Sequence, residues 1–222
     1  MDRDTAPAMF VHSILDGSEK TGTVDVTVAD SEGHTETFML SAGEWKRLNK
    51  TAPIEHLGEV DEELYDRLTA AAERTITVRE AAAILTNGDK SASAILRKLT
   101  QKGRSKESAE NAVELLKKRG YLNEEDACRR IAEALVRSKH YGRRRVRDYL
   151  ISHGYDTRTA EIAAEEIPDE EIREALIYHL TRKFRNYTDL PMAERKKATA
   201  SLMRLGFTWQ EIQNTARETE QN

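Results

Sequence analysis

The feature that most constrains the fold is a Leu-xxx-Gly pattern that occurs three times, at Leu99–Gly103, Leu150–Gly154 and Leu202–Gly206. Successive glycines are 51 and 52 residues apart, and each one closes an apolar pattern with helical spacing. A residue able to cap the next helix stands two positions after each glycine: Ser105, Asp156 and Thr208. The pattern predicts tandem three-helix repeats, and such an array forms an elongated body with long faces.

The glycines are expected to serve the fold. Gly103, Gly154 and Gly206 supply the positive φ that reverses the chain after a helix, and Gly120 ends a helix in the same way. Gly142 is interpreted as the break between two helices of the middle repeat. The residue six positions after each repeat glycine is small or apolar, which allows close helix packing: Ala109, Ala160 and Ile212.

A small β-containing module precedes the repeats. Residues 1–20 show little periodicity and are expected to be mobile. Alternation over Val24–Val28 and Thr35–Leu40 predicts a β-hairpin, and helix starts at Ser41 and Asp61 complete a module over residues 21–75.

The remainder reads as helices only. A capping box at Thr77 opens the first repeat, and the three repeats are placed at residues 76–120, 121–168 and 169–222. The predicted class is therefore mainly α, with a small N-terminal hairpin-containing module.

Composition and motifs exclude several classes of protein. The chain has 222 residues, 38% hydrophobic and 33% charged, without an apolar run long enough for a membrane span or a signal peptide. The lone Cys128 is interpreted as a core thiol in a reducing cytoplasm. The six histidines lack metal-ligand spacing, and no phosphate loop, serine elbow or metal helix occurs. We expect no membrane contact, no cofactor, no metal and no enzymatic activity.

Positive charge is concentrated in the middle of the chain. Residues 92–147 hold 16 Lys and Arg against 7 Asp and Glu, although the whole chain has a net charge of −4. The densest part is Arg137–Arg147, where Arg143, Arg144, Arg145 and Arg147 follow Gly142. If a helix starts there, outward backbone N–H groups and guanidinium groups together suit phosphates or carboxylates. A solvated helix face is the alternative, and Tyr141 suits a stacking role or a hydrophobic staple equally.

Several short patterns together resemble the RecX family of bacterial recombination regulators. They are Leu96-xx-Leu99-xxx-Gly103, Gly120-Tyr121-Leu122-Asn123, the Tyr141-Gly142 turn with its arginines, and Leu150-xxx-Gly154. The resemblance covers residues 77–219, and some members of the family have a β-rich N-terminal extension. Two departures are a longer loop at Asn186–Pro191 and an acidic extension at Glu59–Asp66.

The resemblance implies a curved row of three-helix units and a cytoplasmic protein that binds the RecA filament on single-stranded DNA. Such a protein restrains ATP hydrolysis, strand exchange and stimulated repressor cleavage. The basic concave side of the family corresponds here to Arg129, Arg130, Lys139 and the Arg143–Arg147 cluster. A monomer is expected. The alternatives are a free-standing DNA-binding protein and an adaptor for an unrelated partner.

Overall fold

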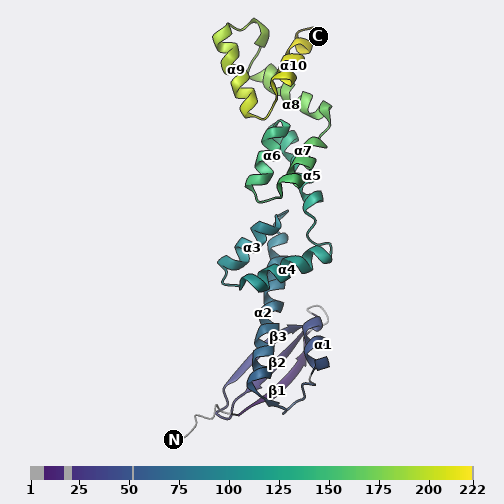
Figure 1. Ribbon diagram of the computed structural model, residues 1–222, viewed down its shortest axis with the longest axis vertical. Coiled ribbons are helices and arrows are strands. Elements are labelled where there is room, and N and C mark those ends of the chain that lie inside the picture. Colours follow the sequence, from purple (N-terminus) through teal and green to yellow (C-terminus); the bar gives the residue numbers. More distant parts are fainter. Residues whose placement is uncertain (1–7, 18–21, 52, 222) are drawn as a thin grey trace. The chain divides into compact units, whose positions relative to one another are not determined.

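The computed structural model describes residues 8–17, 22–51 and 53–221, and it divides the chain into two compact units (Figure 1). Unit 1 comprises the described residues of 1–87 and 96–121, and unit 2 those of 88–95 and 122–222. The division falls within helix α3 (Ala92–Gln101), between Ile95 and Leu96. The described residues form ten α-helices and one four-stranded sheet, so the prediction of a mainly α chain with a small N-terminal β structure is confirmed.

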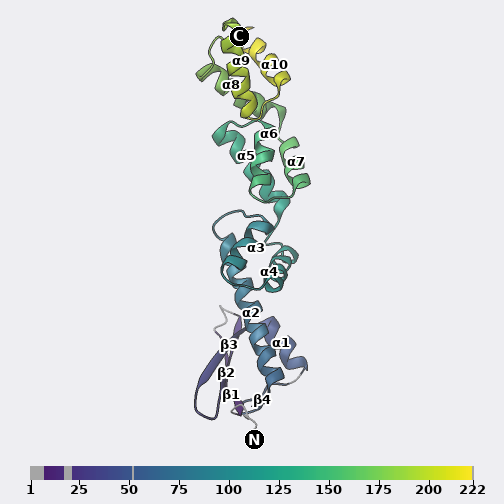
Figure 2. The same ribbon diagram turned by 60° about the vertical axis from the view of Figure 1, so that its left-hand side comes forward.

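Unit 1 is built on an antiparallel sheet of order β3-β2-β1-β4. Helices α1 (Ala42–Thr51) and α2 (Glu62–Leu85) lie on one face of it (Figure 2). Val24, Val26 and Val28 are buried, with Phe38 and Leu40 of the next strand, because alternate residues face the helices. The strands are β1 (Met9–Asp16), β2 (Thr23–Ala29), β3 (Thr35–Ser41) and β4 (Glu59–Val60).

The predicted hairpin is confirmed as β2 and β3, but two further strands extend the sheet on the β2 side. The expectation of a mobile segment over residues 1–20 is wrong for residues 9–16, which form β1. Residues 1–7 and 18–20 lie outside the described residues. The register of β1 against β2 shifts between Val11 and Ser13, so this strand lacks the strict alternation that marks β2.

Helix α2 runs without a break through the position where the sequence analysis starts a new helix. Asp61 caps its start, because its Oδ1 accepts the Leu64 N–H at 2.8 Å. Thr77 does not cap a helix. Its hydroxyl donates to the Glu73 carbonyl at 2.7 Å within α2, which satisfies the side chain inside the helix. The predicted boundary between residues 75 and 76 therefore lies inside one helix, and α4 (Lys106–Lys118) packs against it.

Unit 2 contains the helices of the second and third predicted repeats. Asn123, Asp156 and Thr208 cap three of them, as the sequence predicts. The α-helices are α5 (Glu124–Lys139), α6 (Arg143–Ser152), α7 (Thr157–Glu165), α8 (Asp169–Arg182), α9 (Met192–Arg204) and α10 (Trp209–Gln221). A short 3₁₀ turn, η1 (Tyr187–Asp189), precedes α9.

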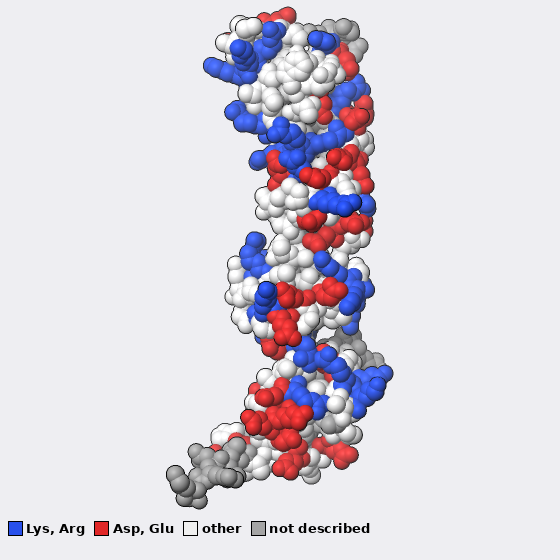
Figure 3. Space-filling view, in the orientation of Figure 1, with Lys and Arg blue, Asp and Glu red and all other residues white. Residues whose placement is uncertain are grey.

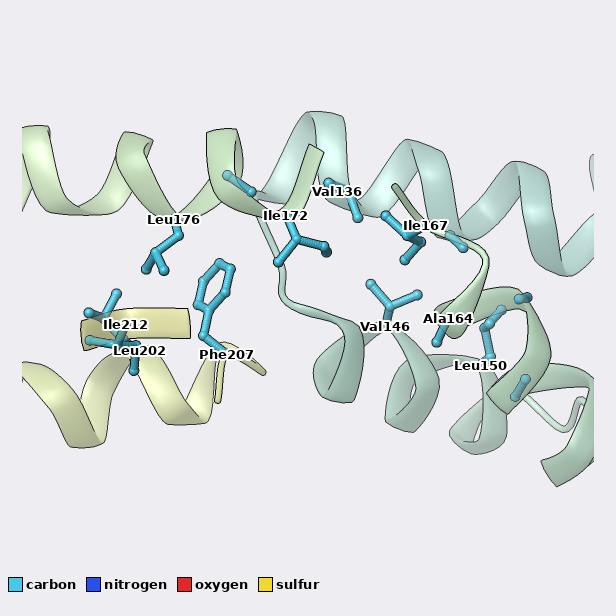
Figure 4. Packing of buried hydrophobic residues seen from close by; sticks show 14 of the residues in the cluster. Val136, Val146, Leu150, Ala164, Ile167, Ile172, Leu176, Leu202, Phe207 and Ile212 are labelled. Atoms are coloured by element: carbon cyan, nitrogen blue, oxygen red, sulfur yellow. The ribbon is translucent and has the colours of Figure 1, made fainter. Parts of the chain in front are cut away.

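The core of unit 2 is continuous across these two repeats (Figure 4). Val146 and Leu150 of α6 pack in the same cluster as Leu176 of α8, and all three side chains are fully buried. Phe207 is the largest fully buried side chain among the described residues and lies close to Leu176 and Leu202. The cluster extends through both repeats because α8 also packs against α5.

Within unit 2, two helices begin on the glycine turn of a later segment. Ser91 Oγ and Ser93 Oγ donate to the carbonyls of His153 and Gly154, both at 2.8 Å. The Gly142 N–H, 51 residues after Ser91, donates to the Leu205 carbonyl at 2.8 Å, beside Gly206. The start of α3 thus docks on the Gly154 turn at positions equivalent to those of α6 on the Gly206 turn, but it donates through serine hydroxyls instead of backbone N–H groups.

The glycines fall into two kinds. Gly103, Gly120, Gly154 and Gly206 have φ between 73° and 101°, which confirms their predicted role in ending helices. Gly142 instead precedes α6 with φ −79°, and a side chain there would meet Phe207 N at 2.7 Å. Close approach of two backbones, rather than a positive φ, requires glycine at this position.

Candidate macromolecule-binding surface

All eight residues that the sequence analysis proposes for binding lie in unit 2. Arg129, Arg130 and Lys139 are on α5, Tyr141 follows its end, and Arg143, Arg144, Arg145 and Arg147 form the start of α6. The four arginines of α6 lie close together because residues 143–147 span only about one and a half turns at the start of the helix.

Four of the proposed arginines form ion pairs inside the chain. Arg129 contacts Asp126 at 2.9 Å and Glu166 at 2.8 Å, and Arg147 contacts its neighbour Asp148 at 2.7 Å. Arg130 holds Asp89 through two hydrogen bonds, which lower the pKa of that carboxyl group below its usual range. Arg143, the fourth, is described below.

Arg143 connects three segments of unit 2 through its side-chain hydrogen bonds. Its Nη2 donates to the Ile167 carbonyl and to Asp169, each at 2.6 Å, and its Nη1 donates to Glu211 at 3.4 Å. The side chain is only 23% exposed. Arg143 therefore links the start of α6 to the start of α8 and to α10, which is a structural role.

The expectation that backbone N–H groups at the start of α6 point outward is wrong. The N–H of Gly142 donates to the Leu205 carbonyl, and the N–H of Arg144 donates to the Gly206 carbonyl at 3.3 Å. The turn between α9 and α10 thus accepts two of the N–H groups at this helix end, which are not offered to an anion.

Replacing Arg143 with alanine is expected to destabilise unit 2 by about 2 kcal/mol, because charge-assisted hydrogen bonds to two segments disappear. Arg144→Ala is expected to change stability by less than about 0.5 kcal/mol, since this side chain is exposed. Urea unfolding followed by circular dichroism compares the two variants. Equal stabilities would contradict the structural role of Arg143.

Four cations around the contact between α6 and the Gly206 turn remain unpaired. Lys139, Arg144 and Arg145 were proposed from the sequence, and Arg204 at the end of α9 joins them because Gly206 lies against Arg145. All four are exposed, and none makes a side-chain hydrogen bond or ion pair with another described residue. We call these four the junction cations. Figure 3 shows Lys and Arg side chains gathered where α6 and α9 meet.

Sequence reasoning missed Arg204. It stands two residues before Gly206, far from the basic segment in the chain, and only the docking of Gly142 on Leu205 brings it to α6. The sequence shows only that Arg204 lies near a repeat glycine. It does not indicate which other segment the turn at that glycine contacts.

Tyr141 lies between these cations and the core. The ring is partly buried against the hydrophobic cluster of unit 2, and the Arg145 guanidinium lies 5.7 Å from its centroid. The contact is a cation–π interaction that holds Arg145 over the ring.

The lone cysteine and the metal-ligating side chain types form no metal site in the described part of the chain. Cys128 is fully buried, which confirms the predicted core thiol, and burial raises its pKa to about 11. Among the described residues no cluster of three His, Cys, Asp or Glu side chains is arranged to hold a metal ion. In the same residues, no helix combines the length and the apolar character needed to cross a membrane.

These features define a mainly α repeat protein with an N-terminal sheet and a surface of unpaired cations. The chain has the fold of RecX. A crystal structure of regulatory protein RecX matches it with a TM-score of 0.73 and 16% identity, covering 93% of this chain and 99% of that one. RecX from Lactobacillus salivarius matches with a TM-score of 0.63 and 16% identity, covering 68% of this chain and 99% of its own. No protein-family model and no curated protein matches the sequence.

Proposed function

We propose that this chain is a RecX-type regulator that binds the RecA filament on single-stranded DNA and restrains its ATP hydrolysis, strand exchange and coprotease activity. The observation that carries the proposal is the fold likeness to RecX over 93% of the chain. The junction cations support it, because exposed guanidinium and ammonium groups without carboxylate partners suit an anionic or acidic partner.

The binding is proposed to involve several filament protomers at once. Repeats offer several modest contacts, and a second contact made by the same molecule benefits from a high effective concentration. The regulator should therefore prefer the assembled filament to free RecA, and it would act in the cytoplasm without enzymatic activity of its own.

The test measures RecA ATP hydrolysis on single-stranded DNA while this protein is titrated. Inhibition is expected with the unchanged chain. The triple variant Arg144→Gln/Arg145→Gln/Arg204→Gln should need an about tenfold higher concentration for half inhibition, since removal of three interface charges is worth about 1.4 kcal/mol. No inhibition by the unchanged chain would overturn the proposal.

A matched control separates this surface from net charge. Arg158, Lys183 and Arg217 are exposed cations of unit 2 outside the junction, and Arg158→Gln/Lys183→Gln/Arg217→Gln removes the same charge. This control should inhibit like the unchanged chain. If both triple variants lose inhibition equally, the junction cations have no special part. Co-sedimentation with free and filamentous RecA tests the preference for the filament.

A further inference from the structure

Unit 1 contains a pocket of about 680 Å³ that the proposed function does not use. Its walls come from the start of α1, the middle of α2 and one face of α4, all within unit 1. The sheet, α1 and α4 all pack against α2, and the pocket lies among them. Its volume lies in the range of pockets that hold small-molecule-sized groups.

The walls carry an excess of positive charge. Five cations line the pocket together with two carboxylates, those of Glu44 and Glu114: the cations are Arg47, Arg74, Arg79, Lys118 and Arg119. Unit 1 as a whole is slightly acidic, since residues 1–87 and 96–121 contain 20 Asp and Glu against 16 Lys and Arg. The pocket thus has a net positive lining, although the net charge of the whole unit is negative.

The carboxylates do not neutralise these cations. Glu44 serves both Arg47 and Arg74, and Glu114 pairs only with Lys118, at 3.6 Å. Arg79 lies 2.7 Å from the sulfur of Met39, which is a weak acceptor. Arg119 makes no side-chain hydrogen bond or ion pair with another described residue. Arg79 and Arg119 therefore offer two guanidinium groups without a carboxylate partner at one pocket.

We propose that this pocket binds the phosphate backbone of a single-stranded nucleic acid through Arg79 and Arg119. Two other polar side chains at the walls fit phosphate, because hydroxyl and amide groups commonly contact phosphate oxygens: Ser41 and Asn111. An acidic peptide is the alternative anionic partner, and the octaglutamate experiment below distinguishes it from a nucleic acid.

The residues that line the pocket also predict whether binding depends on the base sequence. None of the described residues that line the pocket is aromatic, so bases find no ring on which to stack. Binding through phosphates alone does not distinguish base sequence. The site is independent of the proposed function, because it needs the nucleic acid and not RecA.

The test follows fluorescence anisotropy of a labelled 20-nucleotide dT strand, without RecA, over a series of NaCl concentrations with the full chain. Arg79→Gln/Arg119→Gln should weaken binding about tenfold at low salt. The slope of log K against log salt should become shallower by about 1.4, because each phosphate that the variant no longer neutralises on a single strand accounts for about 0.7. A dA strand should give the same two results.

The control is Lys46→Gln/Lys50→Gln, which removes two exposed charges of α1 that do not line the pocket. It should retain the slope of the unchanged chain. Equal slopes for the two double variants would overturn the proposal. The proposal would also be overturned if Arg79→Gln/Arg119→Gln lost binding of an octaglutamate peptide but still bound dT like the unchanged chain. The pocket would then be a site for acidic peptides. Inhibition of RecA can fail or succeed without changing either result.

Discussion

Replacing Gly206 with alanine is expected to destabilise unit 2 by about 3 kcal/mol, whereas the same change at Gly103 should cost about 1 kcal/mol in unit 1. Both glycines close a Leu-xxx-Gly turn, and both have positive φ, 101° and 83°. Alanine is strained at either position for that reason alone. At Gly103 a new Cβ would meet no described atom within 4 Å.

The additional destabilisation at Gly206 comes from the approach of two backbones. A Cβ there would lie 2.6 Å from the Gly142 carbonyl oxygen and close to the backbone nitrogen of Arg145. Backbone atoms cannot rotate away, so α6 and the turn must separate. Gly154→Ala should lie between the two, because its Cβ would meet the Ser93 hydroxyl, which can rotate.

Each unit contains one of the two tryptophans, which allows the units to be followed separately. Gly206→Ala and Gly154→Ala are made in a Trp45→Phe background, so that Trp209 reports unit 2. Gly103→Ala is made in a Trp209→Phe background, so that Trp45 reports unit 1. Urea unfolding of each variant is compared with its own background. Equal destabilisation at Gly103 and Gly206 would contradict the close docking of α6 on the turn.

Phe207→Ala is expected to reduce the stability of unit 2 by about 3–5 kcal/mol, the range typical of a large side chain removed from a core. Phe207 is fully buried, and its ring meets that of His179 edge-on at 6.1 Å. It stands where the core of the third repeat meets that of the second (Figure 4). Its removal should therefore weaken both repeats together.

Trp209→Ala is the matched control. Trp209 is larger and only two residues away, but it is 56% exposed, so its removal should cost no more than about 1 kcal/mol. Thermal unfolding followed by circular dichroism at 222 nm measures both variants. A similar decrease in stability in the two would mean that Phe207 does not join the repeats.

Local patterns predicted much of this fold because helix caps and glycine turns depend on neighbouring residues. Asp61, Ser105 and Asn123 each accept the N–H three residues ahead, as their spacing predicts. Strand β1 was missed because its bulge interrupts the alternation, and β4 is only two residues long. The break predicted at Thr77 failed because a threonine hydroxyl can also bond back within a helix.

The candidate surface was less predictable because charge in a sequence does not reveal its partners. Arg129 and Arg143 are paired with carboxylates 37 and 26 residues away. Arg204 reaches α6 only through the contact of two glycine-containing turns. The sequence located the basic region, while long-range packing decided which of its cations stay exposed and unpaired.

The shared way in which α3 and α6 begin has an evolutionary consequence. Each starts on a glycine turn lying a similar distance further along the chain, at Gly154 for α3 and at Gly206 for α6. An inserted copy of 51 or 52 residues, the spacing of the repeat glycines, would place a helix start against a glycine turn at both of its ends. Such a protein can change its length by duplication or deletion of whole modules without a new type of contact between modules.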